Sequence, residues 1–337
     1  MSGRRVLFPI LVFSAIAASQ GIELFVNHVL RPSDSEIAWI SDVVLSAGFV
    51  TVTWLWIRLR ETQIALTDLE RERIVVNTQL TVAARVQTSL LPRLPAPTDG
   101  IRWYGAVEPA GKVGGDYYDF VALPDGRMCV VLADVSGKGV PAAVFMANVR
   151  ATLRAMARDT TQPARLVAHL SAALLDDSAS GLYLTCIVAI VDPAARTMVY
   201  VNAGHPAGVL WNRSGARGLH VGGPPAGLLA DVEFEEESLR FDDGDLLVFV
   251  SDGVTEALNV SGDAVVAAIA SVIAPIDTPT PDRVCDRLLE AARRGHGPGV
   301  DGWMDDRTAV AFGIVCENAV ATPLRAIASP AAAEVVS

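Results

Sequence analysis

Four acidic turns, each beside an apolar run with the character of a β-strand, constrain this 337-residue chain more than any other feature. Glycine next to a carboxylate leaves the backbone bare, so an ion or a phosphate can approach it closely. Strand ends also leave their side chains little freedom. We therefore expect the fold to gather the four turns into one metal site. The turns are Gly114-Gly115-Asp116, Asp134-Val135-Ser136-Gly137, Ser251-Asp252-Gly253 and Asp305-Asp306-Arg307-Thr308.

The charge of such a cluster predicts its chemistry. Two carboxylates about 4 Å apart repel each other by about 4 kcal/mol at an effective dielectric constant near 20, so a bare cluster would be unstable or protonated. Four aspartates balance two divalent cations, and oxygen ligands without His or Cys partners favour Mg²⁺ or Mn²⁺ over zinc. Such a pair of ions activates a water molecule and neutralises a phosphoryl group during transfer. The pattern predicts phosphoester hydrolysis without a covalent intermediate.

Composition excludes several other classes of function. The formal net charge of −11 argues against a nucleic-acid partner, because phosphate binding needs clustered Lys and Arg. The cysteines show no CxxC spacing, which argues against a zinc site or a disulfide framework. None is followed by an arginine six positions later, so a cysteine-based phosphatase is excluded. The cysteines are Cys129, Cys186, Cys285 and Cys316.

Two apolar segments near the N-terminus predict a transmembrane hairpin. Val6 to Ile22 is uncharged and Ile37 to Ile57 carries one acidic residue, and helices of about 17–21 residues just cross a bilayer core. Basic residues flank both outer ends, which places both ends in the cytoplasm. The chain is therefore expected in the cell membrane as a multi-pass protein with a cytoplasmic catalytic part. A cleaved signal peptide ending near Ala15 to Ser19 is the alternative, and it leaves the same orientation.

Residues 59–91 are charged and contain neither Gly nor Pro before Pro92. Seven of ten heptad core positions are apolar, which indicates a weak coiled-coil seam. A dimerising signalling helix and a solvated spacer helix both fit. Prolines at 92, 95 and 97 then end the helix. The predicted parts are a transmembrane hairpin at 1–58, a linker helix at 59–91, a catalytic domain at 92–317 and a disordered tail at 318–337.

The predicted catalytic domain combines short strands with grouped helices. Strand pairs joined by tight turns, with helices between the groups rather than after each strand, predict an α+β fold of antiparallel sheets flanked by helices. The predicted strands are Ile101–Val107, Tyr117–Leu123, Arg127–Val135, Leu182–Val191, Thr197–Asn202, Val232–Phe241, Leu246–Val250 and Thr308–Val315. The predicted helices are Ala142–Arg158, Ala164–Asp176 and Pro281–Arg294.

Six ordered motifs, GGDYYDF, ADVSGKGVPAAVFMA, NAGHPAGVLW, GPPAGLL, SDGVTEA and DDRTAVAF, resemble metal-dependent Ser/Thr protein phosphatases of type 2C (PPM), and in particular their SpoIIE-type bacterial branch. The resemblance covers about residues 83–316. It implies two packed antiparallel sheets flanked by helices, an αββα sandwich, with two Mn²⁺ or Mg²⁺ ions and room for a third. It assigns metal coordination, and catalysis through metal-bound water, to Asp116, Asp134, Asp252 and Asp305. It also assigns the backbone carbonyl of Val135 as a ligand.

Other candidate residues keep two interpretations. By the resemblance, Asp119 and Asp306 either hydrogen-bond metal waters or hold neighbouring loops, and for Asp306 direct coordination is open as well. Lys138 is a candidate for phosphate contact or a solvated lysine. His205 is a candidate proton donor or a turn-stabilising residue, and Arg307 either pairs with a nearby aspartate or contacts substrate.

The resulting prediction is a membrane-anchored protein serine/threonine phosphatase. The resemblance implies a phosphorylated cytoplasmic protein as partner, namely an anti-sigma-factor antagonist in a partner-switching pathway, and the linker helix suggests a homodimer. A catalytically silent interaction module with the same fold is the alternative. A nucleotide cyclase, suggested by Gly-Gly-Asp at 114–116, fits poorly because Tyr117 follows where an acidic residue is needed and the downstream turns have no role there.

Overall fold

The computed structural model describes residues 18, 20–22, 35–160, 162–176, 181–295 and 305–314. The chain divides into two compact units, residues 1–79 and 80–337. Cys316 and the predicted disordered tail at 318–337 lie outside the described residues, as does most of the first apolar segment. The finer division predicted from the sequence, with boundaries after residues 58, 91 and 317, stays a prediction.

One long helix, α2 (Ser35–Leu90), takes in both the second apolar segment and the predicted linker helix. It ends two residues before Pro92, which lacks the N–H group that a continuing helix needs. A search of the described residues found no helix with the length and apolar character needed to cross a membrane. The transmembrane hairpin predicted from residues 6–22 and 37–57 therefore finds no support in this structure.

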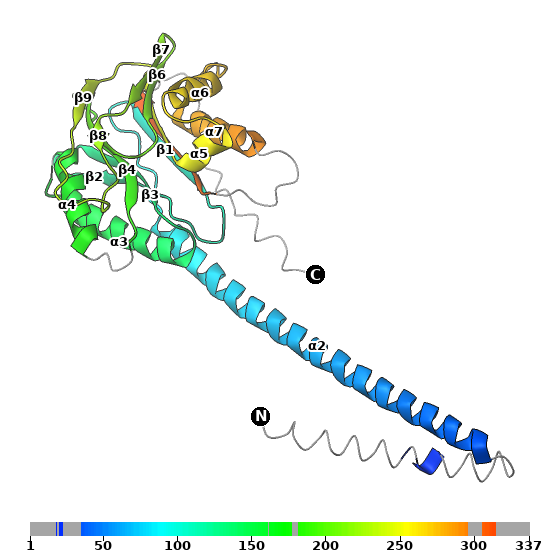
Figure 1. Cartoon of the computed structure of the whole chain (residues 1–337). Coiled ribbons are helices and arrows are strands. Elements are labelled where there is room, and N and C mark those ends of the chain that lie inside the picture. Colours follow the sequence, from blue (N-terminus) through cyan, green and yellow to red (C-terminus); the bar gives the residue numbers. More distant parts are fainter. Residues whose placement is uncertain are drawn as a thin grey trace. The chain divides into compact units, whose positions relative to one another are not determined.

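Two β-sheets form the centre of the second unit (Figure 1). All of their strand pairs are antiparallel except the short parallel pair of β5 and β8. The first sheet has the order β1 (Ile101–Glu108), β11 (Arg307–Ile314), β10 (Leu246–Val250), β6 (Gly208–Asn212), β7 (Gly215–Leu219). The second has the order β2 (Tyr117–Ala122), β3 (Met128–Val135), β4 (Leu184–Asp192), β5 (Thr197–Ala203), β8 (Gly222–Gly223), with β9 (Glu237–Arg240) also paired to β5.

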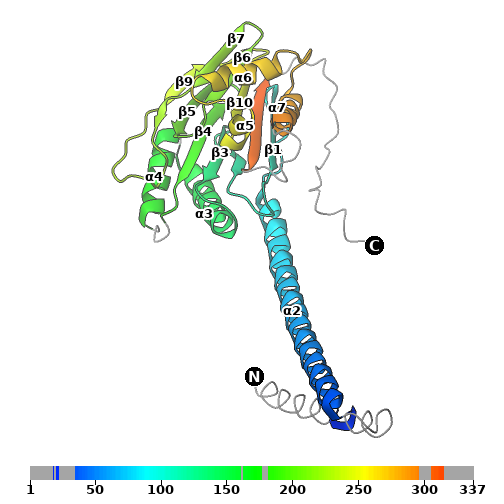
Figure 2. The same ribbon diagram turned by 45° about the vertical axis from the view of Figure 1, so that its right-hand side comes forward.

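Helices cover the outer faces of both sheets (Figures 1 and 2). Buried side chains of α3 (Val140–Ala157) and α4 (Pro163–Asp176) share one hydrophobic core with the second sheet. The first sheet shares another core with α5 (Asp252–Ala257), α6 (Ala264–Ile273) and α7 (Pro281–Gly295). A third core, rich in aromatic residues, lies between the sheets. The four layers confirm the predicted α+β fold of two packed antiparallel sheets flanked by helices.

The core between the two sheets is rich in aromatic side chains that the strands turn inward. Trp103 of β1 packs against Phe312 of β11 with ring centroids 5.4 Å apart, and against Phe120 of β2 across the interface at 6.0 Å. Phe249 of β10 meets Phe312 edge to face at 5.6 Å. Such large rings bury much apolar area and prefer stacked or edge-on contacts. They therefore fix the two sheets against each other, and with them the ends of the strands.

Candidate metal centre

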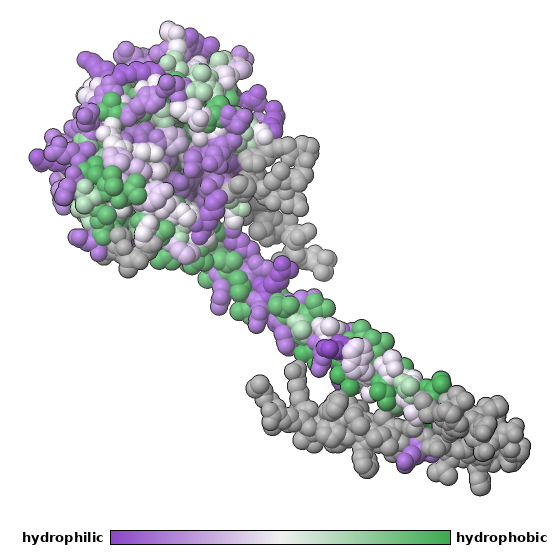
Figure 3. Space-filling model, viewed as in Figure 1, coloured by the Kyte–Doolittle hydropathy of each residue, from purple (hydrophilic) through white to green (hydrophobic). Residues whose placement is uncertain are grey.

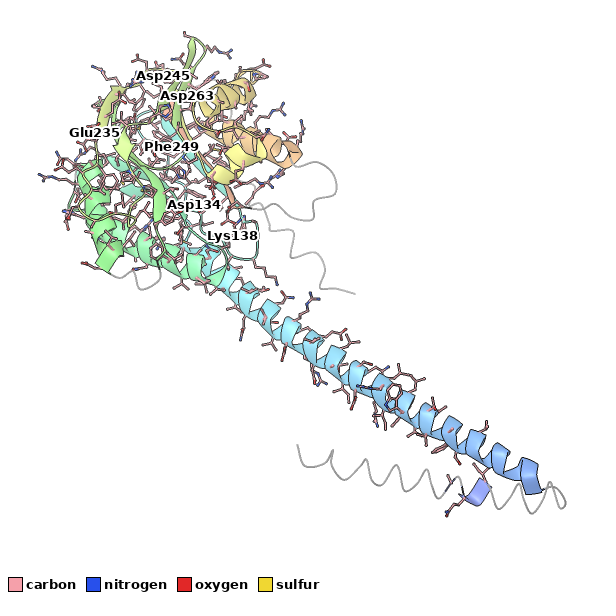
Figure 4. The ribbon with its side chains drawn as sticks, viewed as in Figure 1. Asp134, Lys138, Glu235, Asp245, Phe249 and Asp263 are labelled. Carbon is pink, nitrogen blue, oxygen red and sulfur yellow. The ribbon has the colours of Figure 1, made fainter. Side chains whose placement is uncertain are left out.

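Strand register brings the four acidic turns to one end of the sandwich. In the second sheet, Tyr117 at the start of β2 lies opposite Ala133 near the end of β3, so Asp116 and Asp134 share an edge. In the first sheet, Val250 at the end of β10 lies opposite Ala309 near the start of β11. Figure 4 shows Asp134 and Lys138 at this end, away from Asp245 and Asp263.

Asp116 is almost fully buried immediately before β2. Its Oδ2 accepts a hydrogen bond from the Thr308 hydroxyl on β11, which links the two sheets at this point. Burial raises the pKa of Asp116 well above its usual value, and the carboxylates of Asp134 and Asp306 raise it further. The side chain therefore resists ionisation unless a positive charge comes close.

Asp134 and Val135 form the end of β3 and lie against the Gly-Gly-Asp loop. A Cβ atom on Gly115 would stand 2.9 Å from the Val135 carbonyl oxygen and 3.3 Å from Asp134 Oδ1. Only glycine leaves that space open. Burial, and then the charges of Asp252 and Asp305, raise the pKa of Asp134 to about 8. The Asp134 carboxylate and the Val135 carbonyl therefore lie close to the Gly-Gly-Asp loop, and their role as metal ligands stays a prediction.

Asp252 is the first residue of α5 and follows directly from β10. Its Oδ1 is buried and has no hydrogen-bond partner among the described residues. Burial and the neighbouring Asp305 carboxylate raise the pKa of Asp252 to about 6. Asp305 sits just before β11 and accepts a hydrogen bond from the Asp306 N–H at 3.0 Å. The carboxylates of Asp252 and Asp305 thus come from two neighbouring turns of the first sheet and are near enough for their charges to interact.

Asp306 holds the loops around the other carboxylates through its hydrogen bonds to backbone N–H groups. Its Oδ1 accepts a hydrogen bond from the Ala110 N–H at 2.7 Å, and its Oδ2 accepts bonds from the N–H groups of Gly115 at 2.6 Å and Asp116 at 3.4 Å. Both oxygens are therefore committed to the backbone of the segment that carries Asp116. Of the interpretations predicted from the sequence, this geometry favours the one in which Asp306 holds neighbouring loops.

The donor set fits a hard divalent cation. All the donors are oxygens and the four carboxylates come from different turns; burial, and then the charge of neighbouring carboxylates, raises the pKa values of Asp116, Asp134 and Asp252. Asp252 Oδ1 also remains unsatisfied within the described residues. In the described part of the chain, however, no group of three or more His, Cys, Asp or Glu side chains is already arranged around one point that could hold an ion.

A pocket of about 310 Å³ lies beside the carboxylates. Backbone of the 110–115 loop and of the Gly137–Gly139 turn forms its walls, together with Leu80, Asp305 and Asp306. Lys138 lines it as well, and its Nζ lies 3.1 Å from Asp305 Oδ2. The pocket therefore joins two glycine-rich turns and a lysine to the acidic centre, and the lysine suits it to an anionic group.

Asp119 lies away from this centre in a fully buried position on β2. The Arg154 guanidinium of α3 donates to both of its oxygens, with Nε at 2.6 Å and Nη2 at 2.8 Å. The Tyr117 hydroxyl donates to Oδ2 as well. Asp119 thus fastens α3 to the sheet, and these contacts leave it no part in holding metal waters.

Two of the weaker candidates are buried. His205 lies in the turn after β5, where its backbone N–H donates to Asn202 Oδ1 at 2.8 Å. Its ring Nδ1 lies 2.9 Å from the Thr185 hydroxyl. Burial lowers the pKa of His205 to about 3, so the ring is neutral near pH 7. Arg307 is fully buried, and its guanidinium lies 3.4 Å from the carboxylate of Glu108 on the neighbouring strand. These positions favour structural roles for both.

Sequence reasoning missed the residues that support the carboxylates. Thr308 donates to Asp116, and the Ser251 hydroxyl donates to the Asp306 carbonyl at 3.2 Å while accepting from the Thr308 N–H at 2.9 Å. The alternation of a strand was the available signal, because Asp306 and Thr308 point to the same side of the chain. Gln87 on α2, which contacts Gly114, carried no signal of this kind.

Comparison with known proteins places this site in a family. The family model for stage II sporulation protein E (SpoIIE) matches residues 124–314. The phosphoserine phosphatases RsbU and RsbP of Bacillus subtilis are each 26% identical to the chain, over 190 and 183 residues. Those segments are 56% and 53% of this chain but 56% of RsbU and 45% of RsbP, so the chain spans about half the length of these curated relatives.

Solved structures show the same fold. The RsbU and RsbW domains of a Mycobacterium tuberculosis protein superpose with a TM-score of 0.57 at 26% identity, covering 67% of this chain and 62% of that one. The PP2C domain of SiaA from Pseudomonas aeruginosa gives 0.59 at 18% identity, covering 71% and 97%. The family match spans more than half of the chain and includes three of the four acidic turns, Asp134, Asp252 and Asp305. This chain belongs to the SpoIIE family.

Proposed function

We propose that this chain is a metal-dependent protein serine/threonine phosphatase. One observation carries the proposal: Asp116, Asp134, Asp252 and Asp305 come from four separate turns at one end of the sandwich, beside a pocket, and burial and then neighbouring carboxylates raise the pKa values of the first three. Buried carboxylates close to one another destabilise a fold unless cations neutralise their charge. The phosphoserine phosphatases among its relatives support the same activity.

The chain's own residues divide the work. Two Mn²⁺ or Mg²⁺ ions would be held by Asp116, Asp134, Asp252, Asp305 and the carbonyl of Val135. The proposal also allows a third ion. The metal supplies an activated water and electrostatic neutralisation of the phosphoryl group. Asp306 and Thr308 keep the Asp116 loop in place. Lys138 and the backbone of the Gly137–Gly139 turn would face the phosphate in the pocket.

The proposed substrate is a phosphoserine or phosphothreonine on a cytoplasmic protein, specifically an anti-sigma-factor antagonist in a partner-switching pathway. The family resemblance supports this choice. The pocket's volume of about 310 Å³ is suited to one phosphorylated side chain and adjoining backbone rather than a large ligand. The formal net charge of −11 is a further reason to expect a protein rather than a nucleic acid as partner.

A direct experiment tests the activity. The purified full chain is incubated with a phosphoserine peptide and Mn²⁺, and released phosphate is measured with and without EDTA. We expect metal-dependent release that Asp252→Asn abolishes, whereas Asp263→Asn, at the opposite end of the sandwich, retains it. A wild-type chain that binds Mn²⁺ but releases no phosphate from any phosphoprotein would contradict the proposal.

A catalytically silent interaction module is the second candidate. The observation that favours it is the lack of a preformed group of three metal-binding side chains in the described residues. A silent module predicts that Asp252→Asn leaves pathway signalling in cells unchanged. A phosphatase predicts that the same substitution abolishes signalling.

Membrane attachment and dimerisation through α2 are further parts of the proposal. Trp54 and Trp56 are about half exposed, and Arg58 and Arg60 lie over their rings at 5.5 Å and 4.9 Å. Aromatic and basic residues of this kind gather at membrane–water interfaces. Figure 3 shows apolar side chains along α2. Leu59, Leu66, Leu69 and Val76 are each more than half exposed.

Cell fractionation and light scattering test these two parts separately. Recovery of the full chain in the membrane fraction after a high-salt wash supports an integral attachment, and recovery in the supernatant contradicts it. A dimer in detergent that Leu66→Glu and Leu69→Glu dissociate supports the α2 seam. A monomer at all concentrations tested contradicts it.

A further inference from the structure

Gln87, in the last turn of α2, makes two hydrogen bonds to a single residue of the Gly-Gly-Asp loop. Its Nε2 donates to the Gly114 carbonyl oxygen at 2.6 Å, and its Oε1 accepts from the Gly114 N–H at 3.1 Å. An amide side chain has one donor group and one acceptor, and here both are used on one peptide residue. Gln87 thus binds Gly114 as a neighbouring β-strand would.

The opposite side of the same loop is held by Asp306. The Gly115 N–H donates to Asp306 Oδ2 at 2.6 Å, and a Cβ on Gly114 would lie only 1.9 Å from that oxygen. The loop therefore passes through a narrow space between Gln87 and Asp306. Asp116 follows two residues after Gly114, so these contacts restrict the position of the Asp116 carboxylate.

Glycine makes such outside contacts necessary. Two adjacent glycines lose more conformational freedom on ordering than any other pair of residues, so the segment would sample many conformations without external contacts. A second contact from the same stretch of α2, between Lys112 Nζ and Thr81 Oγ1 at 2.9 Å, lies near the exposed surface. The part-buried contact of Gln87 is the one adjacent to the metal-binding residues.

We propose that Gln87 is a positioning residue that orders the Gly114–Gly115 loop and so holds Asp116 in place for cation binding. The inference rests on the metal site of the proposed function. It adds a residue of α2 to that site, outside the segment matched by the family model. Gln87 itself contacts neither cation nor substrate, and it acts through the loop.

Calorimetric titration of the full chain with Mn²⁺ tests this role. Gln87→Met keeps the length of the side chain but removes both hydrogen bonds, and we expect the Mn²⁺ dissociation constant to rise about tenfold, the size expected for two ordinary hydrogen bonds. The Mn²⁺ concentration for half-maximal activity should rise by the same factor. Thr88→Ala, the neighbouring exposed residue whose hydroxyl bonds only within the helix, should leave the dissociation constant unchanged.

Hydrogen exchange of the 110–118 segment is the second readout. We expect faster exchange in this segment for Gln87→Met and wild-type rates for Thr88→Ala. Gln87→Asn, one methylene shorter, keeps the amide but cannot reach both Gly114 atoms. Its exchange rate in this segment should lie between those of Gln87→Met and Thr88→Ala. A variant with a lower melting temperature but wild-type Mn²⁺ affinity and wild-type exchange would overturn the proposal, because it would leave Gln87 only a general stabilising role.

The outcomes for Gln87 and for the proposed function are distinguishable. If Gln87→Met does not fold, Gln87→Asn decides, and wild-type Mn²⁺ affinity in that variant overturns the inference. A wild-type chain that binds Mn²⁺ but hydrolyses nothing contradicts the phosphatase activity while leaving the effect of Gln87 on binding measurable. An active wild type with a Gln87→Met variant of equal affinity contradicts the inference alone.

Discussion

The Asp306 carboxylate accepts a hydrogen bond from the Gly115 N–H at 2.6 Å, and so joins the turn before β11 to the turn before β2. Hydrogen bonds to a charged acceptor contribute about 1.5–3 kcal/mol, roughly twice the contribution of neutral ones. Asp306 therefore ties the two sheets together at the site, whereas its neighbour Asp305 faces Lys138 and the other carboxylates. Adjacent aspartates thus have different tasks.

Substitution separates the two aspartates. Asp306→Ala removes the acceptors for Ala110 and Gly115, and we expect the free energy of unfolding to fall by about 2–4 kcal/mol because buried N–H groups lose their partners. Asp305→Asn should abolish activity but change the free energy of unfolding by less than about 1 kcal/mol. Urea unfolding of the metal-free chain measures both. Equal destabilisation by the two substitutions would contradict this division.

Removing a repelling carboxylate should stabilise the metal-free protein. Since the pKa of Asp134 is raised to about 8 in the fold, the folded state binds more protons than the unfolded state between about pH 4 and 8. Stability is therefore greatest at low pH within this range and falls as pH rises toward 8. We expect Asp134→Asn, measured in EDTA, to raise the free energy of unfolding by about 1–3 kcal/mol at pH 8 and by much less at pH 5.

The same substitution should abolish phosphate release in Mn²⁺. Thermal unfolding at the two pH values, with the wild type measured in parallel, checks the stability half of this prediction. A destabilised Asp134→Asn at pH 8 in EDTA would show that the carboxylates do not repel one another in the metal-free state.

Lys138 competes with cations for Asp305. Its Nζ lies 3.1 Å from Asp305 Oδ2, but the side chain is largely exposed, so the effect of the pair is small. We expect Lys138→Ala to tighten Mn²⁺ binding about two- to fivefold and to raise KM for a phosphoserine peptide, because a positive charge leaves both the acidic centre and the pocket. Calorimetry measures the Mn²⁺ affinity and steady-state kinetics measure KM. Lys138→Arg keeps the positive charge and should show wild-type values of both. Unchanged KM would remove Lys138 from substrate binding.

The buried ion pair of Asp119 and Arg154 should matter for folding and not for metal binding. Removing one partner of a buried pair costs about 3–5 kcal/mol, because the other charge remains without compensation. Asp119 is fully buried, but Arg154 is partly exposed and can reach water, so we expect Asp119→Ala to cost about 2–4 kcal/mol through Asp119's lost bonds to α3. The Mn²⁺ dissociation constant of the folded variant should be that of the wild type. A weaker affinity would instead link α3 to the site.

The sequence predicted those parts of the fold whose signals are local. The strand Leu246–Val250 was predicted at its observed bounds, because a continuous apolar run ends there in an acidic turn. The predicted strand Val232–Phe241 was too long, since only Glu237–Arg240 pairs with β5. The short β6 and β7 were missed; both begin at a glycine, and a second glycine interrupts β7. The helix that begins at Asp252 was taken for a turn alone, since its glycine at 253 disfavours a helix.

Site residues divide in the same way. Asp134 and Asp252 could be predicted from their position at the ends of apolar strands. The assignment of Asp306 to loop holding could not, because it depends on N–H groups of residues almost 200 positions away. The resemblance includes Gln87, but its contact with Gly114 could not be predicted for the same reason. Contacts of this kind arise from tertiary packing and leave no local pattern.

Titration of the full chain with Mn²⁺, followed at once by calorimetry and by phosphate release from a phosphoserine peptide, tests the central claim most directly. We predict that the wild type binds at least two Mn²⁺ ions and that release follows their occupancy, whereas Asp252→Asn loses both one ion and the activity. Wild-type protein that binds no Mn²⁺, or phosphate release that is indifferent to EDTA and to Asp252→Asn, would contradict the account.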